Sequence, residues 1–152
     1  MKVTMLLADA AQAVAGKLYI LGGGWSITGP APVPSAIALK IEVPWNLATR
    51  RHNITLELIT ADGQLVKLPG QAQGEQVPVR IEGQFQTGIP PGVMEGTPID
   101  ATLAINVNPL PLPPAARYVW RLSIDGDTRE DWQVAFSTRP AQPPVQPLPP
   151  NL

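Results

Sequence analysis

The chain lacks cysteine altogether and contains a single histidine. The absence of cysteine excludes disulfide bonds, thiolate metal sites and a cysteine nucleophile. With one histidine and no cysteine, a zinc site is not expected, because such sites draw several ligands from these two residue types. Lys and Arg number 11 against 12 Asp and Glu, and neither sign is clustered. The chain therefore lacks the basic field that general nucleic-acid binding requires.

Long apolar runs are also missing. No segment approaches the ~20 apolar residues that a membrane-spanning helix needs. The N-terminal residues 1–16 begin with a charge and a short apolar run, as signal peptides do. Thr4 and Asp9 interrupt that run, however, and its alternation favours a first strand. We therefore expect a cytoplasmic, soluble protein with no cofactor and with neither nucleic acid nor a membrane as its partner.

Proline is abundant, with 19 residues, of which 13 lie in clusters at 30–34, 109–114 and 140–150. Between the clusters lie short stretches in which apolar and polar residues alternate. Proline cannot donate a hydrogen bond to a sheet and fixes its own φ angle. The first two clusters therefore indicate connections between strands, and the third indicates a tail that has no strand to pair with.

Alternation with a period of two predicts the strands. In residues 36–43, for example, the odd-numbered apolar residues share one face, and Lys40 and Glu42 lie on the other. Such one-sided burial favours antiparallel sheets. We predict an all-β fold: a single antiparallel β-sandwich, immunoglobulin- or C2-like in outline, with about eight or nine strands over residues 1–138. A proline-rich tail, residues 139–152, is expected to be extended or disordered.

Two local features allow sharper predictions. Residues 9–16 could form a short helix, with Asp9 at its start and Gly16 at its end, or an extended hairpin arm. We favour the arm, because so short a helix is unstable on its own. In the last hairpin, a three-residue loop of residues 125–127 would place Trp120 opposite Trp132 on the core face.

Residues 16–25, GKLYILGGGW, resemble a glycine-rich phosphate loop only superficially. A P-loop ends in Gly-Lys-Ser/Thr and begins a helix, whereas these glycines are followed by another β-like stretch. The dinucleotide-binding fingerprint is likewise absent. We therefore interpret the three glycines as a bulge or sharp bend where the chain passes from one sheet to the other.

Five residues are candidates for contact with a partner or ligand: Trp25, Trp45, Arg50, Arg51 and His52. Tryptophans in or beside the loops of a sandwich serve protein interfaces and sugar-binding modules, although they also fold over the ends of the core. The arginines and His52 are interpreted as the solvated start of a strand, paired with nearby acids, with anion or partner binding as the alternative.

The acidic hairpin DGDTRED, residues 125–131, admits a calcium interpretation if other loops supply carboxylates. Its Asp and Gly residues, however, are also those that the turn itself needs. A hydrolase would have to use His52 as its base, and none of the serines lies in a nucleophile-elbow context.

Three blocks carry a resemblance: LLADAAQ…GKLYILGGGW, KIEVPWNLATRRHNITLELITADG and RYVWRLSIDGD. In this order they resemble a family of small bacterial proteins without an assigned activity, over residues 3 to about 137. The resemblance implies a compact β-sandwich and carries over no catalytic residue. It also suggests that the GGGW and RRH segments are family features.

The sequence thus predicts a non-catalytic protein-interaction or assembly module rather than an enzyme. Its expected partner is another protein or a second copy of the chain. The alternative is a module that binds a carbohydrate or a calcium-dependent ligand, and a hydrolase is the least favoured reading.

Overall fold

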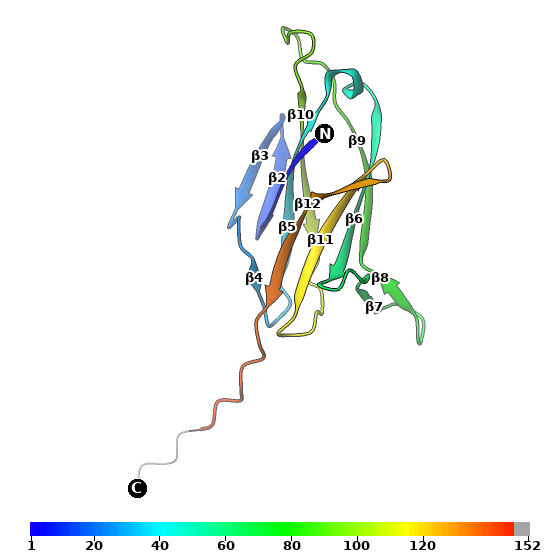
Figure 1. Ribbon diagram of the computed structural model, residues 1–152. Coiled ribbons are helices and arrows are strands. Elements are labelled where there is room, and N and C mark those ends of the chain that lie inside the picture. The colour runs from blue at the N-terminus through cyan, green and yellow to red at the C-terminus, as the bar shows by residue number, and fades with distance from the viewer. Residues whose placement is uncertain (148–152) are drawn as a thin grey trace.

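The structure, a computed structural model, describes residues 1–147 and is all-β, with several sheets (Figure 1). Twelve strands occur in this range, whereas eight or nine were expected. Three of the twelve, β4, β7 and β8, are only two or three residues long and were not expected as separate strands. The helical content of the described residues is one short 3₁₀ turn, η1, and no helix there could span a membrane. The elements are β1 (Lys2–Ala8), β2 (Ala10–Val14), β3 (Lys17–Leu21), β4 (Ile27–Thr28), β5 (Ser35–Val43), η1 (Trp45–Leu47), β6 (Arg51–Thr60), β7 (Lys67–Pro69), β8 (Gln76–Pro78), β9 (Arg80–Gln86), β10 (Ile99–Val107), β11 (Arg117–Ile124) and β12 (Asp127–Thr138).

A three-stranded sheet in the order β1-β5-β10 follows the alternation predicted from the sequence. On its inner face the odd-numbered residues of β5 from Ile37 to Val43 are completely buried, and their cross-strand partners include Leu7 and Leu103. On its outer face Nζ of Lys40 lies 3.3 Å from Oδ2 of Asp100, and Nζ of Lys2 lies 3.6 Å from Oε2 of Glu42. One end of the outer face is therefore charged, while the other carries small apolar residues such as Ala36 and Ala38.

A five-stranded sheet in the order β4-β12-β11-β6-β9 supplies the other side of the core. Even-numbered residues of β6 and β11, and of β12 from Trp132 onward, point inward, and one hydrophobic cluster joins them to the inner face of β5. That cluster contains most of the large buried side chains of both sheets, including Leu56, Trp120 and Phe136. The core therefore lies between the two larger sheets.

The sheets together form a half-barrel. On one side β1 lies beside β12, and β9 and β10 are the terminal strands of their sheets on the other side. The pairing is antiparallel except that the short β4 runs parallel to the end of β12, through Ile27 with Ser137. The expectation of a purely antiparallel arrangement is therefore wrong at this edge.

The register predicted for the last hairpin is also wrong. The loop has two residues, Asp125 and Gly126, whose φ angles of +53° and +86° are those of a type I′ turn. Ile124 pairs with Asp127, and an irregularity then inserts extra residues into β12, so that Trp120 lies opposite Val134 rather than Trp132. Both tryptophans are nevertheless buried, because the irregularity restores the parity on which the predicted core face depends.

Residues 9–16 form a hairpin arm and not a helix, as predicted. β2 and β3 are joined by a two-residue turn at Ala15 and Gly16, both with positive φ. Gly22, Gly23 and Gly24 then lead from β3 toward β4, and so from the two-stranded sheet to the five-stranded one. The predicted bend between sheets is confirmed.

The first two proline clusters connect strands, since residues 29–34 lie between β4 and β5 and residues 108–116 between β10 and β11. After β12, residues 139–147 belong to no strand and are exposed. They extend away from the body of the protein in Figure 1. The remainder of the predicted tail, residues 148–152, lies outside the described residues.

Candidate interaction surface

The β2–β3 hairpin lies over the small-residue end of the β1-β5-β10 sheet. A second buried cluster consists of alanines, Ala8, Ala36 and Ala38 from the sheet and Ala11 from β2, with Leu18 of β3 packed against them. Alanines on the outer face of a sheet allow another layer to approach closely. The hairpin therefore covers one face of the sheet with its inner side and leaves its outer side in solvent.

The outer side and free edge of the hairpin carry large apolar residues in contact with water. The exposed fraction is 52% for Val14, 58% for Tyr19 and 70% for Leu21. Ile20 is also exposed, as are Ile27 of β4, a strand on the same flank of Figure 1, and Val33 in the connection that follows β4. We call these six residues the arm surface. Within residues 1–147 they are six of the ten large hydrophobic residues that are exposed.

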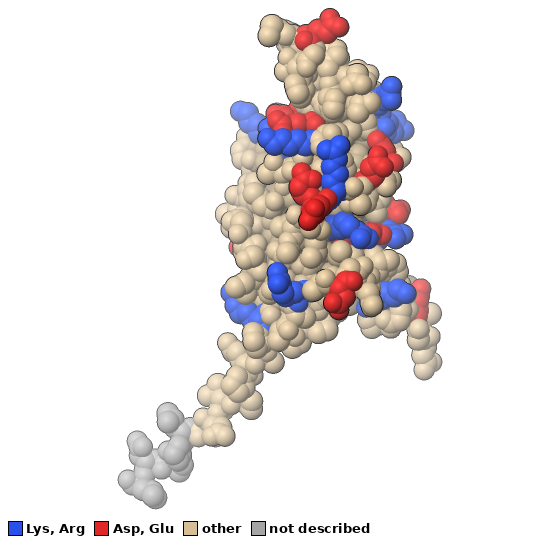
Figure 2. Space-filling model, viewed as in Figure 1, with Lys and Arg blue, Asp and Glu red and all other residues tan. Residues whose placement is uncertain are grey.

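Charge is nearly absent from the arm surface. Between Asp9 and Lys40 the sequence contains one charged residue, Lys17. Figure 2 shows this flank, at the left of the view, mostly without charged side chains, whereas charges of both signs gather over the five-stranded sheet. A low density of charge together with exposed aromatic and aliphatic groups is typical of protein interfaces.

The outer face of the five-stranded sheet provides the contrast. Glu57 of β6 accepts hydrogen bonds from Arg121 at 2.8 Å and from Arg80 at 2.6 Å. The hydrogen bond from the Arg121 guanidinium is the main cause that lowers the pKa of the Glu57 carboxyl, although partial burial opposes it. This face presents paired charges to water, and such faces rarely form stable interface cores.

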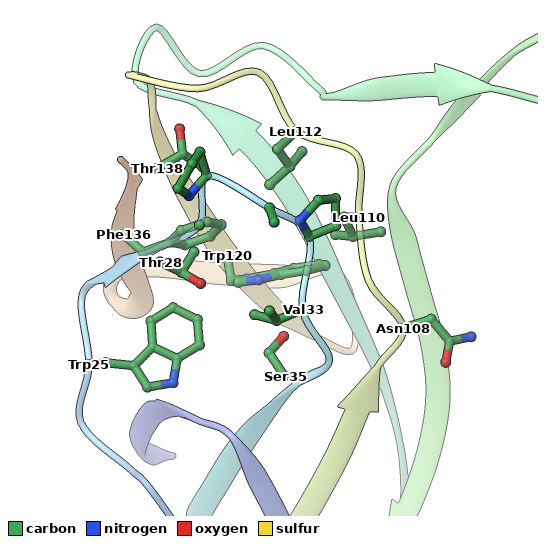
Figure 3. Close-up of a pocket in the computed structure, with 14 residues that line it drawn as sticks. Trp25, Thr28, Val33, Ser35, Asn108, Leu110, Leu112, Trp120, Phe136 and Thr138 are labelled. Atoms are coloured by element: carbon green, nitrogen blue, oxygen red, sulfur yellow. The ribbon is translucent and has the colours of Figure 1, made fainter. Parts of the chain in front are cut away.

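Trp25 lies between the glycine bend and β4 and is half-buried. Its ring packs edge-to-face on Phe136, with the ring centroids 6.0 Å apart, and its side chain contacts the main core. Figure 3 shows Trp25, Trp120 and Phe136 around a hollow that the two proline-rich connections cover. The hollow encloses about 40 Å³, whereas pockets for small molecules usually measure about 300–1,000 Å³.

Trp45 lies at the other end of the molecule. Ser35, at one end of β5, lines the hollow beside Trp25, whereas Trp45 follows the other end of this nine-residue strand in η1. The ends of such a strand are about 26 Å apart, so the two tryptophans form no common platform. Trp45 is half-buried and lines an open hollow of about 650 Å³ together with Lys2, Glu42 and Asn46.

Arg50 and Arg51 are exposed at the start of β6. Among the described residues, no carboxylate lies within 4 Å of either guanidinium, so the expected ion pairs of the arginines are not formed. Their availability for an anion or partner stays a prediction.

His52 is buried rather than solvated, with 2% of its surface exposed. Its Nδ1 lies 2.7 Å from Oδ2 of Asp125, its Nε2 lies 3.0 Å from the carbonyl oxygen of Leu47, and its ring packs on Phe85. Alternation places His52 on the inner face of β6 because its neighbour Arg51 points outward. The interpretation of His52 as a surface residue is therefore wrong.

The carboxylate of Asp125 forms hydrogen bonds with two consecutive residues of β6, His52 and Asn53. Its Oδ1 accepts a hydrogen bond from the Asn53 amide at 2.8 Å. The hydrogen bond from His52 is the main cause that lowers the pKa of the Asp125 carboxyl. Burial opposes it, and the hydrogen bond from the Asn53 amide adds a smaller lowering. Within residues 1–147 no three His, Asp or Glu side chains are close enough to hold a metal ion. The acidic hairpin therefore uses its first carboxylate for structure.

Residues 3–136 match a family of unknown function (DUF6941). The chain belongs to this family. No curated protein and no solved structure matches it. Membership of DUF6941 thus agrees with the resemblance drawn from the three sequence blocks and assigns no activity to any residue.

Sequence reasoning missed most of the arm surface of this DUF6941 chain, although it identified the strands that carry it. It proposed Trp25, Trp45, Arg50, Arg51 and His52 for contact with a partner and did not include Tyr19 or Leu21. A signal was present, because the thirty residues 10–39 contain a single charged residue, Lys17. With Lys17, at the turn end of β3, as its one charged residue, the arm has little of the charge that usually protects exposed strand edges against pairing.

Proposed function

We propose that this DUF6941 chain is a non-catalytic protein-interaction or assembly module that binds through the arm surface. The single observation that carries the proposal is the arm surface itself: apolar side chains exposed on a flank with one charged residue. Burying exposed apolar surface is favourable by about 25 cal/mol per Å². A partner therefore gains free energy on this flank without having to desolvate charges.

The finer description of the fold belongs to the same proposal. The two larger sheets would form a single β-sandwich, immunoglobulin- or C2-like in outline, over residues 1–138, with a proline-rich tail as a separate extension. The shared core between β5 and the strands β6, β11 and β12 supports this description. A bacterial, cytoplasmic setting is likewise proposed from the sequence.

The test compares two substitutions of the same kind. Leu21→Lys places a charge in the arm surface, and Met94→Lys places one at an equally exposed residue in the loop between β9 and β10, with exposed fractions of 70% and 78%. We expect association, measured by size-exclusion chromatography with light scattering and by co-purification, to be lost in the first variant and kept in the second. Equal behaviour of both variants and the wild type would contradict the proposal.

An enzyme is disfavoured by the hydrogen bonds of His52. Both ring nitrogens face acceptors, a carboxylate and a backbone carbonyl, so neither has a free lone pair for a substrate proton. The ring is also covered from solvent. A hydrolase that used His52 as its base would need this network to open first.

The hollow beside Trp45 favours a second candidate, a carbohydrate-binding module. An aromatic ring next to Lys2, Glu42 and Asn46 offers both an apolar face and polar groups, and about 650 Å³ is within the range of ligand pockets. A ligand of the native state must raise the melting temperature. A panel of glycans, with and without calcium, should therefore raise the melting temperature of the wild type but not that of Trp45→Ala. No shift with any glycan would dismiss this candidate.

A further inference from the structure

The arm surface includes a strand edge that no strand of residues 1–147 covers. β3 pairs with β2 on one side and with no strand of the described residues on the other. In a hairpin closed by a two-residue turn, the closing pair Val14–Lys17 exchanges two hydrogen bonds, as does every second pair after it. The N–H and C=O groups of Leu18 and Ile20 therefore point to the free edge. Among the described residues these groups have no partner elsewhere.

We propose that the partner of this edge is the β3 strand of a second copy, paired antiparallel about a two-fold axis at Tyr19. In this register Leu18 of each copy lies opposite Ile20 of the other. The four free N–H and C=O groups of each copy then form four hydrogen bonds between the chains. A register centred on Leu18 or on Ile20 would pair one of these residues with itself and the other with a residue outside β3. The two hairpins become one four-stranded sheet.

A second copy fits the edge because the pairing is self-complementary. An isologous contact brings each residue next to the same surface of its partner, so like charges must not meet. The register sets Lys17 opposite Leu21 and Tyr19 opposite Tyr19, and no two charges face each other. The net charge of −1 adds little repulsion between copies. Tyr19 and Leu21, both well exposed, become cross-strand neighbours on the outer face.

The test uses the absence of cysteine from the chain, so that one introduced thiol per copy has a single possible partner. Tyr19→Cys places two thiols in a non-hydrogen-bonded pair, where Cα atoms are about 4.5 Å apart and a disulfide can form. Lys17→Cys is the control, because the two Lys17 positions are separated by about 13 Å along the strand. We expect covalent dimers on non-reducing gels for Tyr19→Cys and background levels for Lys17→Cys. Equal yields in both variants would overturn the proposed register.

Two variants that each introduce one negative charge distinguish edge pairing from packing of the hairpin's outer face. Tyr19→Glu brings two carboxylates together at the axis, whereas Val14→Glu places the same charge on β2, away from the edge. Only Tyr19→Glu should abolish the dimer in light scattering, and melting temperatures check that both variants fold. The interface is short, below about 1,200 Å², and we expect the dimer to dissociate on dilution. A wild-type chain that is monomeric up to about 0.5 mM would overturn the inference.

The inference rests on the proposed function, but the two can fail separately. If a dimer forms that is sensitive to Leu21→Lys but shows no cross-link at Tyr19→Cys, the interaction module stands and the β3 pairing is overturned. If instead a different protein binds the arm surface of a monomeric chain, the interaction module also stands and the β3 pairing is overturned. If Leu21→Lys changes nothing and no cross-link forms, both are overturned.

Discussion

Asp125 and His52 are 73 positions apart in the chain, yet their side chains meet at 2.7 Å inside the end of the β6–β11 pair. The carbonyl oxygen of Leu47 lies 3.0 Å from the other ring nitrogen, Nε2 of His52. A carboxylate and a carbonyl are both acceptors, so each ring nitrogen of His52 lies at hydrogen-bond distance from an acceptor. One side chain thus connects the β11–β12 turn, the start of β6 and the η1 turn.

The contribution of Asp125 to stability should depend on pH in one direction. Its folded pKa is lowered from the ordinary value of 3.8, mainly by the hydrogen bond from His52. The contribution is therefore full above the ordinary pKa and is lost as the pH falls through the lowered folded pKa. Asn at this position keeps the positive φ and removes the charge.

We expect Asp125→Asn to reduce the free energy of unfolding by about 1 kcal/mol near neutral pH, a modest value because the carboxylate is partly exposed. Urea denaturation of both proteins between about pH 2 and pH 7 measures the difference, which should shrink at the acidic end. A difference that stays constant with pH would show that the carboxylate's charge contributes nothing.

Removing the ring itself should cost more than removing the charge on its partner. His52→Ala leaves a buried cavity beside Phe85 and deprives Asp125 and the Leu47 carbonyl of a donor. We expect a loss of about 2–4 kcal/mol in the free energy of unfolding. Arg51→Ala, at the adjacent outward-facing position, should change stability by no more than about 0.5 kcal/mol. Chemical denaturation of both variants makes the comparison, and similar losses in the two would contradict the buried network.

The alternation of residues sufficed to predict an all-β chain and the faces of β5, and the instability of so short a helix sufficed to favour a hairpin arm at residues 9–16. These features depend on local periodicity and on the turn chemistry of single residues such as Gly16. The burial of His52 could not be predicted, because its partner Asp125 is brought to it by the pairing of β6 with β11. The register of the last hairpin failed for a related reason. Extra residues in β12 compensate for the two-residue turn, and no local pattern marks them.

Gly22, Gly23 and Gly24 show both what the sequence can predict and what it cannot. The bend was predicted from the sequence, but the need for Gly23 arises from tertiary contacts. A Cβ at this position would lie 2.6 Å from Cγ2 of Ile20 and 3.1 Å from Cδ1 of Leu6. Gly24, by contrast, has open space around it and a φ of +89°. Neighbouring glycines are therefore required for different physical reasons.

A double-mutant cycle distinguishes these reasons. Gly23→Ala should destabilise the protein by about 1–3 kcal/mol through overpacking, and Ile20→Ala in the same chain should recover part of the loss. Gly24→Ala should cost about 1 kcal/mol through backbone strain, with no recovery from Ile20→Ala. Thermal or chemical unfolding of the single and double variants measures both effects. Additive losses for Gly23→Ala and Ile20→Ala would rule out the proposed clash.

The position of the arm on the sheet should depend on the small residues beneath it. Ala38 is almost fully buried on the outer face of β5, under the hairpin, and its cluster includes Ala11 and Leu18. Ala38→Leu would force the two layers apart, and we expect a loss of about 1–3 kcal/mol. Thr4→Leu is the matched control, because Thr4 lies on the same outer face but is exposed.

Hydrogen exchange identifies where the loss occurs. In Ala38→Leu the β2–β3 amides should exchange faster while those of β5 and β11 stay protected, because the core between the two larger sheets is untouched. Since β3 carries the edge proposed to pair between copies, the same variant should also weaken self-association. Uniformly faster exchange across all strands would mean that Ala38 stabilises the whole fold rather than only the packing of the β2–β3 hairpin on the sheet. Unchanged exchange in β2 and β3 would mean that the arm does not depend on close contact with the sheet.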